Sequence, residues 1–352
     1  MSTIADVARE AGVSKATASR ALTGSPQVSS DTRQRVHEAA QRLGYVPSTS
    51  AVSLATGRTR NVGVVLPHVN RWFFAEVLEG IQTALLDRGL DLTLYDATPG
   101  SAGRERVFTE FLARKRFDGV IAVGLEPAAS ELEALLSLGR PVVSVIGTED
   151  RTSLVALDDS HASALATSHL VSLGHRRIAF LGGTSASHWP HVESARYEGY
   201  AREMRESGLA PHITRTPAEL SMPAGYEAAV DLLSDPSNRP TAIVGACDEV
   251  AIGAIIAARR LGILVPSDLS VVGIDDHVNA EMFALTTLRQ VPREQGATAV
   301  ELLTRHLEDP TLEPITVSIR PRLVVRNSTA APSGSTPAAV RDFGLSRVAS
   351  DV

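Results

Sequence analysis

Several features that mark other classes of protein are scarce or absent in this chain. It contains one cysteine, Cys247, which excludes a disulfide within the chain and indicates a reducing compartment. No apolar run approaches the ~20 residues of a membrane span, and no apolar segment follows a basic start as it does in a secretory signal peptide. Aromatic residues make up 4% of the 352 residues and hydrophobic residues 43%, as in soluble globular proteins. We therefore expect a cytoplasmic protein with no membrane partner, folded into two or three compact units.

The short motifs of common enzyme classes are also missing. The chain has no Gly-x-Ser-x-Gly elbow, no Gly-x-x-x-x-Gly-Lys-Ser/Thr phosphate loop, and neither a Cys-x-x-Cys nor a His-Glu-x-x-His metal site. The diglycine Gly182-Gly183 could cradle a phosphate at a helix N-terminus, but it is more often a turn. Asp275, Asp276 and His277 are consecutive, and three consecutive residues rarely point at one metal ion. We predict no enzymatic activity, no cofactor and no metal site.

The charge of the chain is unevenly distributed. Residues 1–60 hold eight Lys and Arg against four Asp and Glu, a net charge of +4, so the remainder carries −10 within the total of −6. A basic head on an acidic body suggests a polyanion partner for the head alone. Contacts to phosphates would make that binding strongly salt-dependent.

The basic head begins with two short helical patterns joined by a tight turn. Thr3 can cap the first helix, Gly12 can adopt the left-handed conformation that ends it, and Ser14 can cap the second. The second helix is expected to bury Ala18 and Leu22. Its exposed residues are then Lys15, Ala16, Thr17, Ser19 and Arg20. This pattern is typical of a helix-turn-helix, which places its second helix in the DNA major groove; two amphipathic helices that merely pack together are the alternative.

The next segments complete the head and connect it to the body. A third helix is predicted to start at Ser29 or Ser30 and to stop at Gly44. Residues 47–60 are rich in small polar residues and predict a linker, although residues 51–55 could form a short helix that is unstable alone. The linker is either a flexible tether or a hinge that folds on DNA, with Leu54 as an apolar wedge between base steps of the minor groove.

From Asn61 onward, buried-strand patterns alternate with helical patterns. The predicted strands are 62–66, 90–95, 119–123, 141–146, 177–181, 242–245, 270–274 and 316–325. The predicted helices are about 74–85, 104–114, 131–138, 162–173, 194–207, 225–233, 250–261 and 293–307. This alternation predicts doubly wound parallel sheets in two similar α/β halves, with a cleft suited to a small ligand. Residues 329–352, dominated by Ala, Ser, Pro and Gly, predict a disordered tail.

Several separate motifs recur in one family of proteins. In the first 60 residues they are Thr3-Ile-Ala-Asp-Val-Ala8, Gly12-Val-Ser14, Ser19-Arg-Ala-Leu22, Leu43-Gly-Tyr45 and Ser53-Leu-Ala-Thr-Gly57. In the body they are Phe73-Phe74-Ala-Glu76, Leu173-Gly-His175, Gly199-Tyr200 after Arg196, and Ser270-Val-Val-Gly-Ile-Asp-Asp276. With these motifs, the chain from Thr3 to about Asn327 resembles the LacI/GalR family of bacterial transcriptional regulators.

The resemblance implies a multidomain architecture of α and α/β parts. A helix-turn-helix headpiece (1–46) and a hinge (47–60) would precede a two-lobed, periplasmic-binding-protein-like body (61–328). The lobes, each a doubly wound parallel sheet, would comprise about 61–158 with 290–319 and about 159–289 with 320–328. A homodimer, with a tetramer as the alternative, would read a near-palindromic double-stranded DNA operator, and a small-molecule effector bound between the lobes would control its affinity. A repressor is expected; an activator, an α/β enzyme with a DNA-binding head and a periplasmic-type sugar binder are the alternatives.

For DNA recognition, the resemblance singles out the start of the second helix. Lys15, Ala16 and Arg20 occupy positions that set base preference in the family. Arg20 could read a guanine through two hydrogen bonds, whereas Ala16 offers only a methyl group. Phosphate contacts, which fix the register, are expected from Ser14, Thr17 and Ser19. Val52 replaces a family arginine in the hinge, so less electrostatic help is expected there, but Leu54 is retained.

Two routes lead to the effector site. Ligands of open α/β sheets lie beyond the carboxyl ends of strands, and this rule nominates residues 68–74, 146–147, 182–185, 247–248 and 275–276. The resemblance points to overlapping positions, with Phe73 and Phe74 as an aromatic wall and Arg196 as a clamp. The predicted effector-binding residues are His68, Phe73, Phe74, Arg196, Leu220, Cys247, Asp248 and Asp275.

Each of these residues also has an ordinary structural interpretation. Arg196 could be a helix-surface cation, Asp275 a capping or inter-lobe carboxylate, and Cys247 a small buried residue. At least one of the two phenylalanines could be plain core. Ile146 and His68 stand where the family often has an aspartate, so the site has fewer acceptors for hydroxyl groups. A sugar or sugar derivative is the expected effector.

Overall fold

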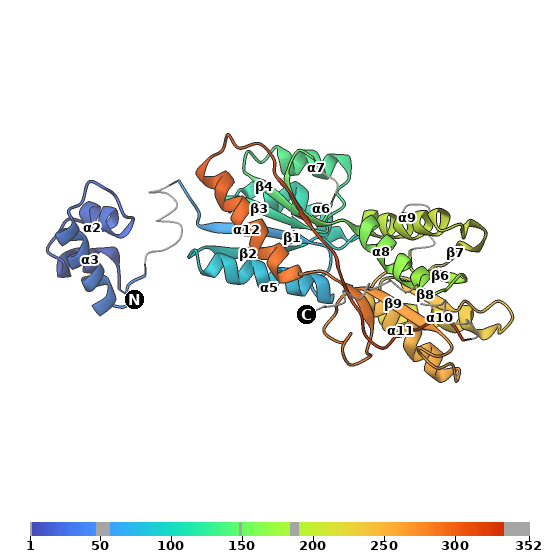
Figure 1. Ribbon diagram of the computed structural model, residues 1–352. Coiled ribbons are helices and arrows are strands. Elements are labelled where there is room, and N and C mark those ends of the chain that lie inside the picture. The colour runs from blue at the N-terminus through green and yellow to red at the C-terminus, as the bar shows by residue number, and fades with distance from the viewer. Residues whose placement is uncertain (1, 47–56, 148–149, 184–189, 334–352) are drawn as a thin grey trace, which may run out of the picture. The chain divides into compact units, whose positions relative to one another are not determined.

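The computed structural model describes residues 2–46, 57–147, 150–183 and 190–333. They form a three-helix headpiece and a body built on two separate sheets (Figure 1). The chain divides into two compact units, Met1–Ala156 with Val291–Ser318 and Leu157–Gln290 with Ile319–Val352. The predicted hinge, including Leu54, and the predicted tail beyond residue 333 lie outside the described residues. Among the described helices, none is both long and apolar enough to cross a bilayer.

The headpiece is organised by its helix caps. Its helices are α1 (Ile4–Glu10), α2 (Lys15–Leu22) and α3 (Ser30–Arg42). The side chains of Thr3 and Asp6 each accept a hydrogen bond from the other residue's backbone N–H, as a capping box does. Gly12 ends α1 with φ +67°, and Ser29 caps α3. The helices close over a small core that includes buried Ala21, whereas Leu22, predicted to be buried, is only half-buried.

Unit 1 contains a six-stranded sheet in the order β11-β5-β4-β3-β1-β2. Its strands are β1 (Asn61–Leu66), β2 (Asp91–Asp96), β3 (Gly119–Val123), β4 (Val142–Val145), β5 (Ser153–Leu157) and β11 (Thr316–Ile319). Its helices are α5 (Trp72–Leu86), α6 (Ala102–Arg106), α7 (Ala129–Leu136) and α12 (Pro292–Glu308), with a π turn (Val107–Phe111) and a 3-10 turn (Leu112–Arg114) after α6. Strands β2, β1, β3, β4 and β5 are parallel to their neighbours.

Unit 2 repeats this plan in the order β12-β10-β9-β8-β6-β7. Its strands are β6 (Ile178–Leu181), β7 (Thr214–Thr216), β8 (Ala242–Gly245), β9 (Ser270–Asp275), β10 (Thr286–Arg289) and β12 (Arg322–Val324). Its helices are α8 (Asp159–Ser172), α9 (His191–Glu206), α10 (Met222–Ser234) and α11 (Asp248–Arg260), with a 3-10 turn at Ala210–His212. The helix pairs α8–α9 and α10–α11 pack on separate apolar cores, one on each face of the sheet. Strand β12 pairs with β10 in antiparallel fashion, an exception to the expected parallel sheets.

Two predictions near the C-terminus are wrong. The single strand predicted over 316–325 is two strands, β11 and β12, which belong to different sheets. The break falls at Arg320 and Pro321, and the proline, which has no backbone N–H to donate to a strand ladder, is the sign of it that the prediction overlooked. Residues 329–333, predicted to belong to a disordered tail, are among the described residues, and Thr329 and Ala330 are hydrogen-bonded to unit 2. Thr329 Oγ1 lies 3.0 Å from Nε2 of His169, and the backbone N–H of Ala330 donates to Oγ of Ser270 at 3.0 Å.

Close helix packing sets the shape of unit 1 around β1 and β3. Helices α5 and α12 lie side by side on one face of the sheet (Figure 1). A Cβ atom at Gly80 of α5 would lie 2.1 Å from the carbonyl oxygen of Arg293, and one at Gly296 of α12 would lie 2.3 Å from that of Val77. Only glycine at these two positions permits so close an approach of α5 to α12.

Candidate functional site

The exposed face of α2 carries the residues predicted to read DNA. Lys15, Ala16 and Arg20 are exposed, while Thr17 and Ser19 are half-buried. Ser14 caps the helix, because its Oγ accepts a hydrogen bond from the backbone N–H of Thr17 at 3.1 Å and lies 2.9 Å from Oγ1 of Thr17. The hydroxyl groups of Ser14 and Thr17 therefore orient the start of α2 as well as being available to phosphate.

The cations of α2 differ from the other cations of the headpiece in their partners. Among the described residues, the headpiece ion pairs join Arg9 to Asp6, Arg35 to Asp31 and Arg42 to Glu10. Arg33 donates to the carbonyl oxygens of Ser25 and Val28 and so holds the loop after α2. No ion pair in this part of the chain involves Lys15 or Arg20. Among these cations, Lys15 and Arg20 on α2 are therefore the ones best placed to bind an external anion.

In unit 2, Arg196 lies at the centre of a buried polar cluster. Its Nε donates to Oδ1 of Asp159 at 2.7 Å, its Nη1 donates to the carbonyl oxygen of Ala246 at 2.6 Å, and its Nη2 lies 3.5 Å from Oδ1 of Asp275. These partners come from the start of α8, the end of β8 and the end of β9. The interpretation of Arg196 as a surface cation is wrong, since 4% of the residue is exposed.

The charges in this cluster stabilise one another. Burial by itself would lower the pKa of Arg196, but the carboxylates of Asp159 and Asp275 raise it above its ordinary value. Burial raises the pKa of Asp275, and Arg196 opposes this effect. Burial also raises the pKa of the Cys247 thiol, so this cysteine stays protonated and behaves as a small buried residue. One guanidinium and two carboxylates leave the cluster without excess positive charge.

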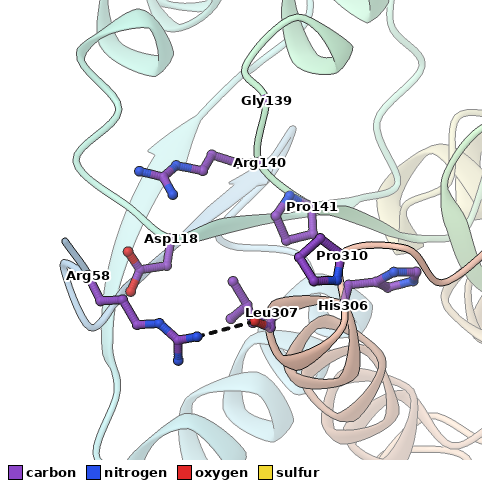
Figure 2. Close-up of a pocket in the computed structure, with 8 residues that line it drawn as sticks. All are labelled: Arg58, Asp118, Gly139, Arg140, Pro141, His306, Leu307 and Pro310. Atoms are coloured by element: carbon purple, nitrogen blue, oxygen red, sulfur yellow. Dashed lines mark hydrogen bonds between the residues drawn. The ribbon is translucent and has the colours of Figure 1, made fainter. Parts of the chain in front are cut away.

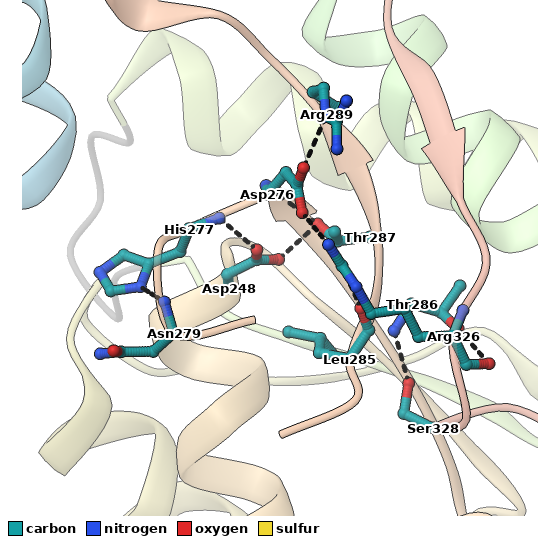
Figure 3. A network of polar contacts seen from close by, with 10 residues as sticks. All are labelled: Asp248, Asp276, His277, Asn279, Leu285, Thr286, Thr287, Arg289, Arg326 and Ser328. Carbon is teal, nitrogen blue, oxygen red and sulfur yellow. Dashed lines mark hydrogen bonds and ion pairs between the residues drawn. The ribbon is translucent and has the colours of Figure 1, made fainter. Parts of the chain in front are cut away.

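The backbone at the end of β9 adopts an unusual conformation. Asp275 has φ +136° and Asp276 has φ +57°, and consecutive positive values are uncommon for residues other than glycine. The side chain of Asp275 accepts a hydrogen bond from Nε2 of Gln290 at 2.5 Å. The side chain of Asp276 binds Arg289 at 2.5 Å and Arg326 at 2.7 Å (Figure 3). Strained backbone of this kind clusters at functional sites, and here it aims one carboxylate toward Arg196 and the next toward a different arginine pair.

Asp248 holds the loop that follows β9. It is fully buried, and its Oδ1 accepts a hydrogen bond from Oγ1 of Thr287 at 2.6 Å, while its Oδ2 accepts one from the backbone N–H of His277 at 2.8 Å (Figure 3). Burial raises the pKa of Asp248 to about 8. Both oxygens are used within the protein, so the contacts favour a positioning role over the predicted contact with an effector.

In unit 1, the predicted aromatic residues gather where β1 ends and α5 begins. The rings of His68 and Phe74 meet edge to face with centroids 6.0 Å apart, and those of Phe73 and Phe74 do so at 5.7 Å. A Cβ atom at Gly124 would lie 2.6 Å from the Phe74 ring, so the chain after β3 packs directly on it. All three rings are half-buried. Burial lowers the pKa of His68, with a smaller contribution from Arg71, which favours the neutral ring.

The sequence missed two members of the unit 2 cluster. Asp159 binds Arg196 and follows the region of β5. Gln290 binds Asp275 and follows β10. Neither strand was predicted. The rule that ligands lie beyond strand ends would have nominated both had those strands been recognised. Leu220 is half-buried and packs against the two cores of unit 2.

Comparison with known proteins gives consistent matches along the chain. Residues 3–48 match the model of bacterial regulatory proteins, lacI family, and residues 167–329 match that of a periplasmic binding protein-like domain. Catabolite control protein A of Priestia megaterium is 33% identical over 332 residues, covering 93% of this chain and 99% of that protein. The structure of the lac repressor dimer bound to operator and the anti-inducer ONPF shares 26% identity with a TM-score of 0.82, covering 94% of this chain and 99% of that one. The complex of the transcriptional regulator CelR with cellobiose shares 29% identity with a TM-score of 0.68, covering 93% and 100%.

Proposed function

This chain belongs to the lacI family of bacterial regulatory proteins, and from that premise we propose that it is a transcriptional repressor whose operator affinity is set by a small-molecule effector. The observation that carries the proposal is the exposed, cationic face of α2 on a capped helix-turn-helix. A repressor of this kind acts on double-stranded DNA in the cytoplasm and performs no catalysis.

We propose the following division of work on α2. Lys15, Ala16 and Arg20 contact base edges, with Arg20 suited to a guanine. Ser14, Thr17 and Ser19 contact phosphates and fix the register. In the hinge, which lies outside the described residues, Leu54 is the proposed minor-groove wedge.

The effector that best suits the unit 2 cluster is a neutral polyol such as a sugar. Arg196 is balanced by Asp159 and Asp275, so a negatively charged ligand would meet no excess positive charge there. Guanidinium N–H groups and carboxylate oxygens together can donate to and accept from hydroxyl groups. In unit 1, the rings of His68, Phe73 and Phe74 present apolar surface on which a sugar ring can stack. The CelR relative binds cellobiose, which supports the same ligand class.

We also propose a homodimer, which a near-palindromic operator requires. In unit 2, the loop after β9 exposes two large apolar side chains, with 70% of Val278 and 83% of Met282 accessible to solvent. Apolar side chains exposed together in this way mark interaction surfaces. Substituting Met282→Asp tests this surface, with a shift from dimer to monomer in analytical ultracentrifugation as the expected result.

The function is tested by selecting DNA from a random duplex pool with the purified chain. An enriched near-palindrome is expected, and mono- and disaccharides are then titrated against the bound duplex to find the effector. Recovery of no enriched sequence would contradict the proposal. Turnover of any of these sugars would favour the enzyme alternative.

A further inference from the structure

A pocket of about 420 Å³ opens in unit 1 at the edge of the sheet where the strands begin (Figure 2). It is lined by Arg58, Asp118, Gly139, Arg140, Pro141, His306, Leu307 and Pro310. Asp118 directly precedes β3 and Pro141 directly precedes β4, while Leu307 is in the last turn of α12. The predicted effector residues of unit 1 follow the other ends of the strands, so this pocket is a separate site.

The side chains that dominate the pocket are two arginines. Figure 2 shows the guanidinium groups of Arg58 and Arg140 on either side of the Asp118 carboxylate. Arg58 donates to the carbonyl oxygen of Leu307 at 3.4 Å. Arg140 is half-buried, and among the described residues no carboxylate lies within ion-pair distance of it. The ring of His306 is directed to Ser153, with Nε2 2.7 Å from Oγ, and forms another wall.

The one carboxylate in the pocket is already used by the backbone. Oδ1 of Asp118 accepts from the backbone N–H and the hydroxyl of Thr59, at 2.8 and 3.0 Å, and Oδ2 accepts from the backbone N–H of Arg60 at 2.8 Å. Asp118 therefore fixes the segment that carries Arg58. Among the residues that line the pocket, two arginines therefore stand with one carboxylate, whose oxygens already accept hydrogen bonds from Thr59 and Arg60.

Further arginines lie on the segments that meet near the pocket. Arg60 donates to the carbonyl oxygen of Gly89, and Nδ2 of Asn61 donates to the carbonyl oxygen of Arg116 at 2.7 Å, so these segments meet at the same edge of the sheet. Arg60 and Arg116 are exposed, as are Arg114 and Lys115. Asp91, which begins β2 and whose backbone N–H donates to the carbonyl oxygen of Arg60, is also exposed, and Arg114 lies 3.8 Å from Glu110. This edge of the sheet therefore carries charges of both signs.

We propose that this pocket binds a phosphate group through Arg58 and Arg140. The planar fork of a guanidinium matches the oxygens of a phosphate and binds them in pairs. A pocket of about 420 Å³ lies within the usual range for small ligands and has room for more than the phosphate itself. The phosphate belongs either to a free phosphorylated metabolite or to the DNA backbone.

The position of Arg58 in the chain links the pocket to DNA binding. Eleven residues separate Val46, at the end of the headpiece, from Arg58. Such a segment spans at most about 40 Å, so a headpiece on DNA keeps this edge within reach of the same duplex. Phosphate bound at Arg58 also holds the residues that directly follow the predicted hinge, which favours an ordered hinge.

The test compares the full chain with its Arg140→Gln variant. The matched control is Arg205→Gln, because Arg205 is an exposed arginine near the end of α9 in unit 2. In the first arm, inorganic pyrophosphate is titrated by calorimetry without DNA at constant ionic strength. If a free phosphate is the ligand, Arg140→Gln weakens binding by about tenfold, the scale of one charge-assisted hydrogen bond. Arg140→Lys, which keeps the charge but not the fork, gives an intermediate value, and Arg205→Gln has no effect.

In the second arm, operator affinity is measured as a function of salt concentration. If the DNA backbone supplies the phosphate, Arg140→Gln reduces the slope of log K against log salt by about 1, and Arg205→Gln leaves it unchanged. The phosphate site is contradicted if Arg140→Gln matches the wild type in both arms, with the fold of each variant checked by thermal unfolding. The second arm depends on the proposed function. If the chain binds no operator, that function fails, and the first arm alone decides the phosphate site.

Discussion

Arg196 illustrates which properties of a single residue the sequence predicts and which it does not. Its position in a family motif nominated it as an effector contact, but no sequence pattern indicated that it is buried between two carboxylates. Asp159 is its strongest partner and lies 37 positions away. Such pairings depend on which strands are adjacent in the sheet, and this order is not encoded in local periodicity. The cap and the exposed face of α2 were more accessible to prediction, because caps and exposed faces are local properties.

Replacing Arg196 by alanine is expected to destabilise unit 2 as well as abolish the effector response. Asp159 and Asp275 would be left buried without a cation, which typically costs about 3–5 kcal/mol. Arg196→Lys keeps the charge and should recover part of this loss. Urea unfolding followed by saccharide titration of the operator complex measures both effects. Arg202→Ala, an exposed position on the same helix, is the control, and equal midpoints for Arg196→Ala and the wild type would contradict the assigned ion pairs.

Replacing Arg20 by alanine is expected to relax base preference at one operator position. A bidentate contact with guanine contributes about 1–3 kcal/mol of discrimination. Binding to the selected operator is compared with binding to its single-base variants. Arg9→Ala is the control, because Arg9 is paired with Asp6 on α1. Unchanged discrimination in Arg20→Ala would mean that α2 does not read the bases through this residue.

At the scale of elements, most helices and strands were predicted from the sequence, but the strands β5, β7 and β10 were not. The central strand β3 is a continuous buried apolar run, which is a strong signal. Strand β10 has the sequence Thr-Thr-Leu-Arg and β7 has Thr-Arg-Thr, and short polar segments of this kind resemble loops. The division of residues 316–325 between two sheets was missed, although Pro321 lies between the two strands and interrupts the predicted one.

The packing of α5 against α12 predicts different effects for two glycine substitutions. Gly80→Ala would place a Cβ atom 2.1 Å from a backbone oxygen, so it should destabilise unit 1 by about 1–3 kcal/mol through overpacking. Gly103→Ala in α6 meets its nearest atom at 3.6 Å and should be neutral or stabilising by up to about 1 kcal/mol. Thermal unfolding of both variants checks this, and equal melting temperatures would contradict the close approach of the two helices.

Attachment of residues 328–333 to unit 2 is expected to depend on pH. The ring of His175 contacts Thr241, Ser270 and the carbonyl oxygen of Ala330, and burial lowers its pKa. Because the folded pKa is below the unfolded one, the stabilisation present above the ordinary pKa of 6.5 is lost as the pH falls through the folded pKa. The free energy of unfolding should therefore decrease as the pH falls below about 6.5.

The histidine is tested by measuring urea unfolding between pH 5 and 8. His175→Gln is expected to flatten the acidic part of the profile, although half-buried His169 contributes in the same direction. His37→Gln, at an exposed position of α3, is the control. An unchanged profile in His175→Gln would remove this residue as the cause.

At the scale of the whole molecule, the charge distribution and the alternation of strands and helices indicated the organisation of the chain. A basic headpiece precedes an acidic body, and the body contains two sheets of six strands each. Composition could not show the pocket lined by Arg58 and Arg140, because its residues are scattered along the sequence and meet only in the folded sheet. The partners of Arg196, on which the proposed choice of effector rests, were likewise inaccessible from the sequence.

The most direct test of the account is the affinity of the full chain for its selected operator, measured by fluorescence anisotropy over a range of salt concentrations with and without the effector. We expect affinity to fall steeply with salt, to drop to the non-specific level when Lys15 and Arg20 are both replaced by alanine, and to change by about 5–150-fold with effector, as coupled sites typically do. Equal affinity for operator and unrelated duplex, with no change on adding any saccharide, would contradict it.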